Sequence, residues 1–393
     1  MIPNYYEFRS ATKVLSGEHA IEHVPFELAN LGVARALVVT DKRVRELGLV
    51  DPLLDALADS HIEVAAVFDD VPVDSSVAGA NALAETYRAA GCEGSVAVGG
   101  GSVLDSAKGL ALVLASGGAD LMTMRGSEIL SNPALVPLVA IPTTAGTGSE
   151  VTGVAVIKDT GRDVKMAFVS FDLQPHVAVL DPRMTLGLPP RITASTAMDA
   201  LVHSVEAASG LQKNPLSDAY AHAAIALIRE HLPTVLAEGR DRQGRLALAN
   251  AALMAGIAFS NSMVGAVHAI GHACGAISHV AHGDAMAILL PHCMRFNLDV
   301  CEAAYAELLL PLAGPDVFAT TPAEKRAAAA IDAVESLLAT CASAGLPTQL
   351  RQAGVTADQL DAIAQLAIDD GSVAMNAKQL TLTDARVILE EAL

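Results

Sequence analysis

A regular alternation of short β-type runs with helical segments fills the first half of this chain and then stops. The β-type runs are apolar and rich in β-branched residues, and they occupy 35–41, 63–70, 94–101 and 138–144. Strands that alternate with helices in this way form a parallel sheet covered by helices on both faces. The first half is therefore expected to be an α/β domain.

Two further β-type runs, 151–159 and 164–170, flank a short turn that contains Gly161. A glycine-containing turn between two such runs is typical of a β-hairpin. We expect this hairpin to be added to the parallel sheet. The run 176–181 is the last strand candidate in the chain.

Beyond the proline-containing segment 186–195, the sequence shows only helical patterns separated by Gly and Pro. One of them has a clear predicted start, where Thr321 could act as N-cap and Glu324 could complete a capping box. The change of pattern predicts two domains. They are an α/β domain over residues 1–185 and an all-helical domain over residues 186–393.

Charge limits the partners of this chain. Its 393 residues include 44 acidic and 25 basic side chains, which gives a formal net charge of −19, and no basic run opposes it. A negative field of this size repels nucleic acid and anionic lipid, so neither is an expected partner. Polar residues interrupt every apolar run before it reaches membrane-spanning length, so no membrane insertion is expected.

The cysteine content bears on the compartment. The five cysteines are scattered and show no CxxC spacing; they are Cys92, Cys274, Cys293, Cys301 and Cys341. A chain of this size needs no disulfide framework, and such thiols suit a reducing compartment. The first 15 residues lack the basic and apolar regions of a secretion signal. We therefore expect a cytoplasmic protein.

A glycine-rich turn joins the strand candidate 94–98 to the next helix. It consists of Gly99, Gly100, Gly101 and Ser102. Glycines let a ligand approach the backbone, and the free amides at a helix start attract phosphate. Ser102 and Asp105 could instead simply form a capping box. Because three successive glycines exceed what a plain turn requires, phosphate binding is the favoured interpretation.

Asp41 ends the first strand, two strands before these glycines, whereas the usual dinucleotide motif places its glycines after the first strand. Asp41 could bind the ribose hydroxyls of NAD and repel the 2′-phosphate of NADP, or Thr40 or Asp41 could only cap the next helix. Position alone leaves both interpretations open. A second polar loop, 142–150, follows a strand candidate, and its small residues and hydroxyls suit a ligand crevice.

Histidines and one aspartate recur at helical spacing in the second half. Asp199 and His203 lie four residues apart on a predicted helix, so both side chains leave one face. His268 and His272 repeat that spacing, and His282 follows soon after. Such groups are costly to bury unless a partner such as a divalent cation is present. The donor set suits Fe²⁺ or Zn²⁺ rather than Mg²⁺ or Ca²⁺, and spacing alone does not show which histidine is left out.

Five segments together resemble the iron-containing (group III) alcohol dehydrogenases over nearly the whole chain. They are 98–109, 141–152, 196–207, 265–276 and 281–297. The family's fold, an α/β nucleotide-binding domain followed by an all-helical metal domain, agrees with the pattern described above. The resemblance implies hydride transfer between a small alcohol or diol and NAD, with the matching aldehyde as product. It also implies a metal that acts as a Lewis acid and a homodimer or larger homo-oligomer.

The resemblance also implies roles for individual residues. The implied metal ligands, with iron as the family's metal, are Asp199, His203, His268 and His282. The implied cofactor contacts are Asp41, Gly99, Gly100, Gly101, Ser102, Asp105, Thr143, Thr144, Thr147, Ser149 and Lys165. His272 is left beside the nicotinamide as the candidate catalytic proton relay, and Phe259 matches a position of the substrate pocket. Glu206, which shares the helix face of Asp199, is expected to support a ligand.

Several positions depart from the family pattern and leave the substrate open. Val73 stands where many members carry Asn, Ala273 replaces a frequent Pro, and Met286 replaces a frequent Asn. None of these changes removes a ligand. The alternative functions are a hydroxyacid–oxoacid transhydrogenase, a dehydroquinate-synthase-like lyase and a non-catalytic protein that binds metal and nucleotide. The lyase would require a basic cluster near the ligands, where the chain is poor in Lys and Arg.

Overall fold

The chain forms two compact units. The computed structural model describes residues 3–117, 120–127, 136–162 and 164–393. One unit comprises residues 9–187, and the other comprises residues 188–393 together with residues 3–8. No sequence pattern indicated that the first residues belong to the helical unit. The division into an α/β domain of residues 1–185 and a helical domain of residues 186–393 stays a prediction.

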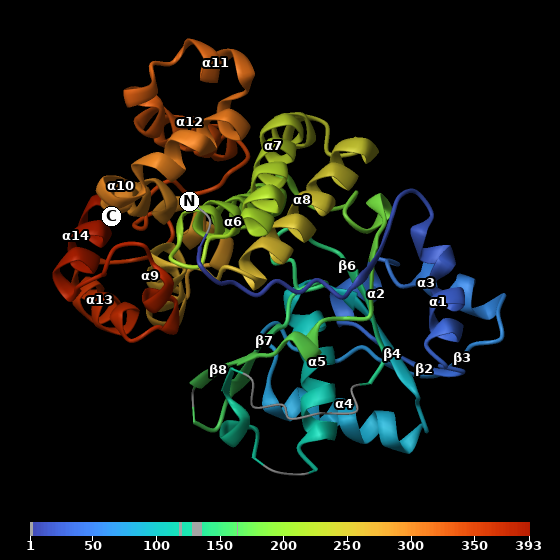
Figure 1. Cartoon of the computed structure of the whole chain (residues 1–393). Helices are drawn as coiled ribbons and strands as arrows, with labels where there is room; N and C mark the ends of the chain where they lie inside the picture. The colour runs from blue at the N-terminus through green and yellow to red at the C-terminus, as the bar shows by residue number, and fades with distance from the viewer. Residues whose placement is uncertain (1–2, 118–119, 128–135, 163) are drawn as a thin grey trace. The chain divides into compact units, whose positions relative to one another are not determined.

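The unit of residues 9–187 is built on a six-stranded sheet in which every described strand pair is parallel (Figure 1). In spatial order the strands are β1 (Lys13–Ser16), β9 (Val177–Leu180), β6 (Leu138–Pro142), β4 (Gly94–Gly99), β2 (Arg35–Val39) and β3 (Glu63–Phe68). The predicted parallel sheet is confirmed. The edge strand β1 had no clear signal in the sequence, because its residues are mostly exposed.

Helices cover both faces of this sheet. One face carries α1 (Val24–Asn30) and α3 (Asp51–Ala58), and the other carries α4 (Val77–Ala89) and α5 (Gly101–Ala115). Along β2, Leu37 and Val39 join the core with α4 and α5, whereas Ala36 and Val38 join the core with α1 and α3. A strand buried on both faces has no polar alternate positions, which is why such segments appear as continuous apolar runs.

Short helical segments complete this unit. They are α2 (Lys42–Glu46) and the 3-10 helices η1 (Ala20–His23), η2 (Leu121–Met124), η3 (Phe171–Leu173) and η4 (Pro182–Met184). Helix α2 directly follows β2, so its start lies at the carboxyl end of that strand.

The predicted hairpin forms, but it does not extend the parallel sheet. Strands β7 (Val154–Asp159) and β8 (Val164–Val169) pair antiparallel, and together with β5 (Gly126–Ser127) they make a separate three-stranded sheet. The expectation that the hairpin is added to the main sheet is therefore wrong. Ile157 and Phe168 pack into the core around α5, so the hairpin covers that helix instead of lengthening the sheet.

The second unit contains helices joined by loops and no strand among its described residues, as the sequence predicted (Figure 1). Its α-helices are α6 (Pro190–Ser209), α7 (Pro215–Ala237), α8 (Arg242–Ser260), α9 (Ala266–Ser278), α10 (His282–Ala313), α11 (Pro315–Thr320), α12 (Arg326–Ala342), α13 (Leu360–Ile368) and α14 (Leu382–Ala392). Its 3-10 helices are η5 (Ala323–Lys325), η6 (Ala357–Gln359) and η7 (Gly371–Met375). Helix α6 packs against α7, α8 and α10, which buries most of its length.

The start of α12 differs from the predicted capping box. The turn η5 precedes the helix, and the hydroxyl of Thr321 donates to the carbonyl of Val317 in α11 at 2.7 Å. Because that hydroxyl bonds backward to the preceding helix, Thr321 does not cap the next one. The predicted capping box is therefore wrong, although the helix itself forms.

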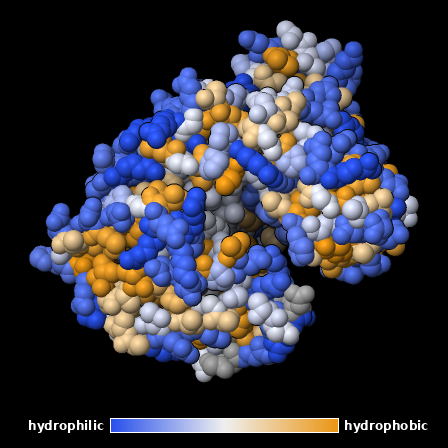
Figure 2. Space-filling view, turned by 180° about the vertical axis from the view of Figure 1, so that it is seen from behind, coloured by the Kyte–Doolittle hydropathy of each residue, from blue (hydrophilic) through white to orange (hydrophobic). Residues whose placement is uncertain are grey.

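The visible surface mixes hydrophilic and hydrophobic residues (Figure 2). On the face seen in Figure 2, hydrophobic residues lie in separate patches among hydrophilic ones. Within the described residues, every helix is too short or too polar to span a bilayer. All five cysteines are buried as free thiols.

Candidate functional site

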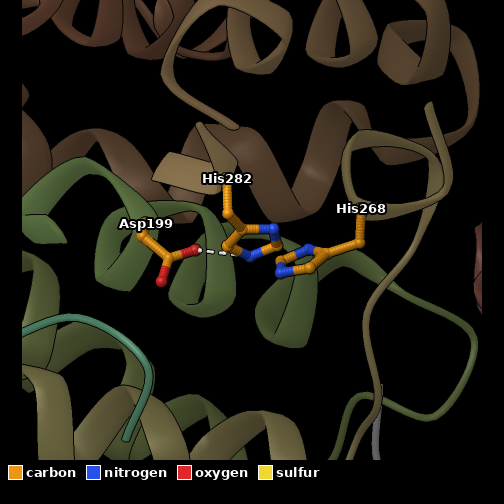
Figure 3. Close-up of side chains that lie close together, drawn as sticks. All are labelled: Asp199, His268 and His282. Atoms are coloured by element: carbon orange, nitrogen blue, oxygen red, sulfur yellow. Dashed lines mark ion pairs between the residues drawn. The ribbon is translucent and has the colours of Figure 1, made fainter. Parts of the chain in front are cut away.

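Three of the implied metal ligands converge in the helical unit. The donor atoms of Asp199, His268 and His282 all lie within 4.8 Å of one another, and Figure 3 shows the three side chains turned toward a common point. Asp199 comes from α6, His268 from α9 and His282 from the first position of α10. Nε2 of His282 is 3.3 Å from Oδ1 of Asp199. Side chains that are distant in sequence therefore form one donor cluster.

His203 lies beside this cluster. Its Nε2 is 4.0 Å from Oδ1 of Asp199, and its ring stacks on that of His268 with centroids 4.7 Å apart. Burial lowers the pKa of His203 to about 3, which keeps the imidazole neutral near pH 7. The neutral imidazole is the form that binds a metal. The structure thus places His203 next to the other donors in the correct protonation state for a ligand.

Several atoms of the cluster are buried without a hydrogen-bond partner in the described part of the chain. They are Oδ1 of Asp199, Nδ1 of His203 and Nε2 of His268. Burial by itself raises the pKa of Asp199, but His203 and His282 hold it below its usual range, so the carboxylate is ionised. Unpaired buried polar atoms are uncommon and cost free energy. A divalent cation bound to Asp199 and His268 would satisfy both, so this donor set fits a metal.

Glu206 orients one of these donors. Its Oε2 is 2.5 Å from Nδ1 of His268, and its Oε1 accepts the backbone N–H of Val267 at 2.7 Å. Burial lowers the pKa of His268, but the contact with Glu206 outweighs this effect and raises it. Because an ionised carboxylate only accepts hydrogen bonds, His268 donates from Nδ1 and keeps Nε2 for a metal. The structure thus places Glu206, which shares the face of Asp199, in a supporting position.

His272 and Phe259 lie against the same rings. The ring of His272 stacks on that of His282 with centroids 5.5 Å apart, and its Nδ1 is 2.9 Å from Oδ2 of Asp370. Phe259 stacks on His203 with centroids 4.2 Å apart. Sequence analysis missed Asp370, since it lies 98 residues beyond His272 and no spacing pattern connects the two.

In the α/β unit, candidate cofactor residues follow neighbouring strands at one edge of the sheet. Asp41 follows β2, Gly100 follows β4, and Thr143 follows β6, and these strands are adjacent. The chain passes from β2 to β3 and then to β4 on the other side of β2. Open α/β sheets bind ligands at such a reversal of strand order, outside the carboxyl ends of the strands. The fold therefore brings these three candidate cofactor positions to one edge of the sheet.

Gly99, Gly100 and Gly101 differ in whether packing within the chain leaves room for a larger side chain. A Cβ at Gly99 would come within 2.4 Å of a valine of α5, and one at Gly101 would lie 3.0 Å from Thr147. A Cβ at Gly100 would meet Thr144 at 3.6 Å, which is an ordinary contact. Gly100 is the N-cap of α5 with φ −78°, a value open to any residue. Among the described residues no contact requires glycine there, so the open space at the helix start fits a phosphate.

Ser102 and Asp105 do not form a capping box, contrary to the simpler of the two interpretations. Helix α5 begins before Ser102 with a glycine N-cap. The hydroxyl of Ser102 donates to the carbonyl of Val73. Asp105 accepts the hydroxyl of Ser149 at 2.8 Å and the backbone N–H of Val156 at 3.0 Å. Both polar side chains therefore link the helix start to neighbouring segments.

Two other candidate cofactor residues make contacts within the chain. Asp41 caps α2 by accepting the backbone N–H of Val44 at 2.8 Å, which confirms the capping interpretation. Its contact with a ribose stays a prediction. Lys165 forms an exposed ion pair with Asp74 at 3.0 Å.

Lys108 of α5, which sequence analysis did not single out, is buried in the α/β unit. Its Nζ donates to Oγ of Ser149 at 2.9 Å, to the carbonyl and hydroxyl of Thr152 at 2.9 and 3.0 Å, and to the carbonyl of Val154 at 2.7 Å. Burial lowers the pKa of Lys108 to about 8 and raises the pKa of the nearby Glu150 to about 7. The sequence signal that could have identified Lys108 is a single lysine within an otherwise apolar stretch of the predicted helix. Lys108 ties α5 to the loop after β6.

Comparisons with known proteins cover both units. A family model described as iron-containing alcohol dehydrogenase matches residues 11–182, and one described as Fe-containing alcohol dehydrogenase family, C-terminal, matches residues 193–393. The 1,3-propanediol dehydrogenase of Klebsiella pneumoniae is 38% identical over 96% of this chain and 96% of its own length. The NAD-dependent methanol dehydrogenase of Bacillus methanolicus is 34% identical over 96% of this chain and 97% of its own.

A solved structure shows the same fold. The crystal structure of a 1,3-propanediol oxidoreductase matches with a TM-score of 0.93 and 34% sequence identity, covering 99% of this chain and 100% of that one. Sequence and structure comparisons therefore point to the same group of proteins.

Proposed function

The chain belongs to the iron-containing alcohol dehydrogenase family, and from this premise we propose that it oxidises a small alcohol or diol with NAD and reduces the matching aldehyde. The observation that carries the proposal is the convergence of Asp199, His268 and His282, with buried donor atoms that lack a partner in the described chain. The similarity to enzymes named for methanol and 1,3-propanediol supports a short substrate.

The helical unit would hold one divalent cation. Its proposed ligands are Asp199, His203, His268 and His282, and the family's name favours Fe²⁺, with Zn²⁺ as the alternative. When both groups are bound, the cation would polarise the alcohol oxygen as a Lewis acid and NAD would accept the hydride. Glu206 would keep Nε2 of His268 directed at the metal. Phe259 would present an apolar ring at the substrate position.

The α/β unit would hold NAD at the edge formed by β2, β4 and β6. Gly100 would leave the amides at the start of α5 open to the pyrophosphate. Asp41 would meet the ribose hydroxyls and repel the additional phosphate of NADP. The other proposed cofactor contacts are Gly99, Gly101, Ser102, Asp105, Thr143, Thr144, Thr147, Ser149 and Lys165.

His272 would handle the proton of the reaction. Its Nδ1 faces the carboxylate of Asp370, so Nε2 is the nitrogen that can accept a proton. The cytoplasmic location and the homo-oligomeric state expected from sequence stay predictions.

An activity assay with controlled metal content tests this proposal. Metal-stripped protein would be loaded with Fe²⁺ or Zn²⁺ and assayed with NAD or NADP against methanol, 1,3-propanediol and a short hydroxy acid. We expect turnover of a small alcohol or diol with NAD, restored by Fe²⁺. The absence of turnover in protein that holds one equivalent of metal would contradict the proposal. Hydroxy acid turnover that requires an oxo acid but no added NAD would indicate the transhydrogenase instead.

A further inference from the structure

The two histidines of helix α9 have matching surroundings at Nδ1. Nδ1 of His268 faces the carboxylate of Glu206 at 2.5 Å, and Nδ1 of His272 faces the carboxylate of Asp370 at 2.9 Å. The rings differ in exposure, since the side chain of His268 is 4% exposed and that of His272 is 43% exposed. The buried ring thus belongs to the donor cluster, and the accessible ring lies beside it with a carboxylate of its own.

Both oxygens of Asp370 have a partner. Asp370 is the N-cap of η7, and its Oδ1 accepts the backbone N–H of Ser372 at 2.8 Å. The other oxygen, Oδ2, faces His272. Because the local cap fixes the carboxylate, the direction of Oδ2 is set before any contact with the histidine. An ionised carboxylate has no hydrogen to donate, so His272 must donate from Nδ1.

The C-terminal end of η7, opposite Asp370, contacts the start of α9. Asn376, at the C-cap of η7, accepts the backbone N–H of Ala266 at 3.2 Å, and Ala266 is the first residue of α9. Asn376 is buried and exchanges two side-chain hydrogen bonds with Asn297 of α10, at 2.8 and 3.0 Å. The segment 370–376 therefore contacts α9 at two points and is also anchored to α10.

From these contacts we infer that Asp370 is a positioning residue for His272, fixing its ring orientation and its Nδ1–H tautomer, while Asn376 fixes the helix that carries it. This inference rests on the proposed function, because it assigns His272 to the proton of the reaction. A carboxylate that orients a histidine raises the basicity of the other ring nitrogen.

The proton balance of the step is simple. Oxidation of an alcohol would transfer a hydride from its carbon to NAD and remove a proton from its hydroxyl oxygen. Nε2 of His272 accepts that proton, so the ring becomes an imidazolium with hydrogen on both nitrogens, and it then passes the proton to water. Asp370 remains ionised throughout and stabilises the imidazolium.

The variant Asp370→Asn separates positioning from folding. Asn is also a good N-cap, so its one carbonyl oxygen can still accept from Ser372. Its NH₂ group would then face Nδ1 of His272 as a donor and force the proton to Nε2. We expect kcat for alcohol oxidation to fall about 10- to 100-fold, with the KM for NAD and the metal content unchanged. Asp369→Asn, at the exposed neighbouring acid, is the matched control and should leave kcat unchanged.

A double-mutant cycle tests whether Asp370 acts through His272. If it does, Asp370→Asn should cause no further loss of kcat in a His272→Ala background. An additional loss there would overturn the inference. A loss of bound metal or of thermal stability in step with kcat would show a merely structural role and would overturn it as well.

The tautomer itself can be measured without activity. In metal-free protein with ¹⁵N-labelled histidine, long-range ¹H–¹⁵N spectra should show His272 protonated at Nδ1 in the wild type and at Nε2 in Asp370→Asn. An unchanged tautomer in the variant would overturn the inference. An inactive wild type with the expected tautomers would instead count against the proposed function alone, so the two failures can be told apart.

Discussion

Each unit of this molecule buries a cluster of charged and polar side chains, and the two clusters differ in how they are satisfied. In the α/β unit, Nζ of Lys108 is surrounded by four oxygen atoms of its own chain. In the helical unit, Oδ1 of Asp199 and Nε2 of His268 have no hydrogen-bond partner among the described residues. We call the first cluster closed, because the chain itself supplies the partners of Lys108, and the second cluster open, because these two donor atoms lack a hydrogen-bond partner among the described residues.

This difference separates a structural cluster from a binding site. Buried polar groups are nearly always paired, so an unpaired set indicates a missing partner. The closed cluster around Lys108 needs nothing from outside and ties helix α5 to the loop after β6. The open cluster around Asp199 leaves donor atoms for the proposed cation. Variants in the two clusters should therefore fail in different ways.

The largest effect is expected from Asp199→Asn in the open cluster. The substitution removes the one carboxylate from the donor set, so we expect loss of bound metal and a fall in turnover of about 10³-fold, since a Lewis-acid cation lowers the activation barrier by several kcal/mol. Metal-stripped Asp199→Asn should nevertheless be about as stable as the metal-stripped wild type, because the loss of its ion pair with His282 is offset by the removal of a buried charge. Metal analysis and urea unfolding measure both quantities.

The exposed acid Asp358, in η6, provides the control for this variant. Asp358→Asn should bind metal and gain stability from it as the wild type does. If Asp199→Asn took up one equivalent of metal with wild-type affinity, the open cluster would not be the metal site.

The second largest effect is expected from Lys108→Met in the closed cluster. Met replaces the side chain at similar length but leaves the oxygens of Ser149, Thr152 and Val154 without their donor. We expect the free energy of unfolding to fall by about 3 kcal/mol, as when one partner of a buried charged network is removed. The measurement is urea unfolding of protein free of metal and NAD. Lys165→Met, which breaks an exposed ion pair, should cost less than about 1 kcal/mol.

Sequence predicted the members of the open cluster better than the partners that surround it. Asp199 and His203 were predicted to share a helix face because they lie four residues apart. The strands of the first half were predictable because a sheet covered on both faces leaves continuous apolar runs in the sequence. Asp370 could not be predicted, because it lies 98 residues from His272 and only the tertiary fold joins them. Local spacing thus indicates which residues share an element, but not which elements meet.

The hairpin shows the same limit in the α/β unit. The alternating runs and the turn at Gly161 correctly predicted β7 and β8 as an antiparallel pair. Which sheet the pair joins depends on packing across the core, where Ile157 lies against helix α5. A period of two residues carries no information about that long-range choice. The error in sheet membership and the failure to predict Asp370 have one cause.

The third prediction concerns pH and the closed cluster. Burial raises the pKa of Glu150 from 4.5 to about 7, so between these values the folded state holds a proton that the unfolded state has lost. Stability from this group is therefore present below about pH 4.5 and is lost as the pH rises through about 7. We expect Glu150→Gln to remove a decline on the order of 2 kcal/mol between pH 5 and pH 8, measured by urea unfolding at several pH values.

The exposed residue Glu85 of α4 is the control for that experiment. Glu85→Gln should leave the pH dependence of the wild type intact. A decline that persists in Glu150→Gln would show that the buried carboxyl does not titrate in this range.

The smallest effect is expected from Gly100→Ala at the start of α5, where the proposed phosphate site lies. Among the described residues a Cβ there meets only Thr144, at 3.6 Å, so the free energy of unfolding should fall only by the cost of Ala at an N-cap, about 0.5–1 kcal/mol. The same Cβ would occupy space proposed for the pyrophosphate, so the KM for NAD should rise roughly tenfold, or about 1.4 kcal/mol. Gly99→Ala should behave in the opposite way, since its Cβ would come within 2.4 Å of a valine side chain and overpack the core by about 1–3 kcal/mol. If Gly100→Ala lost stability but bound NAD normally, that glycine would serve the fold, and the space at the helix start would not be a binding site.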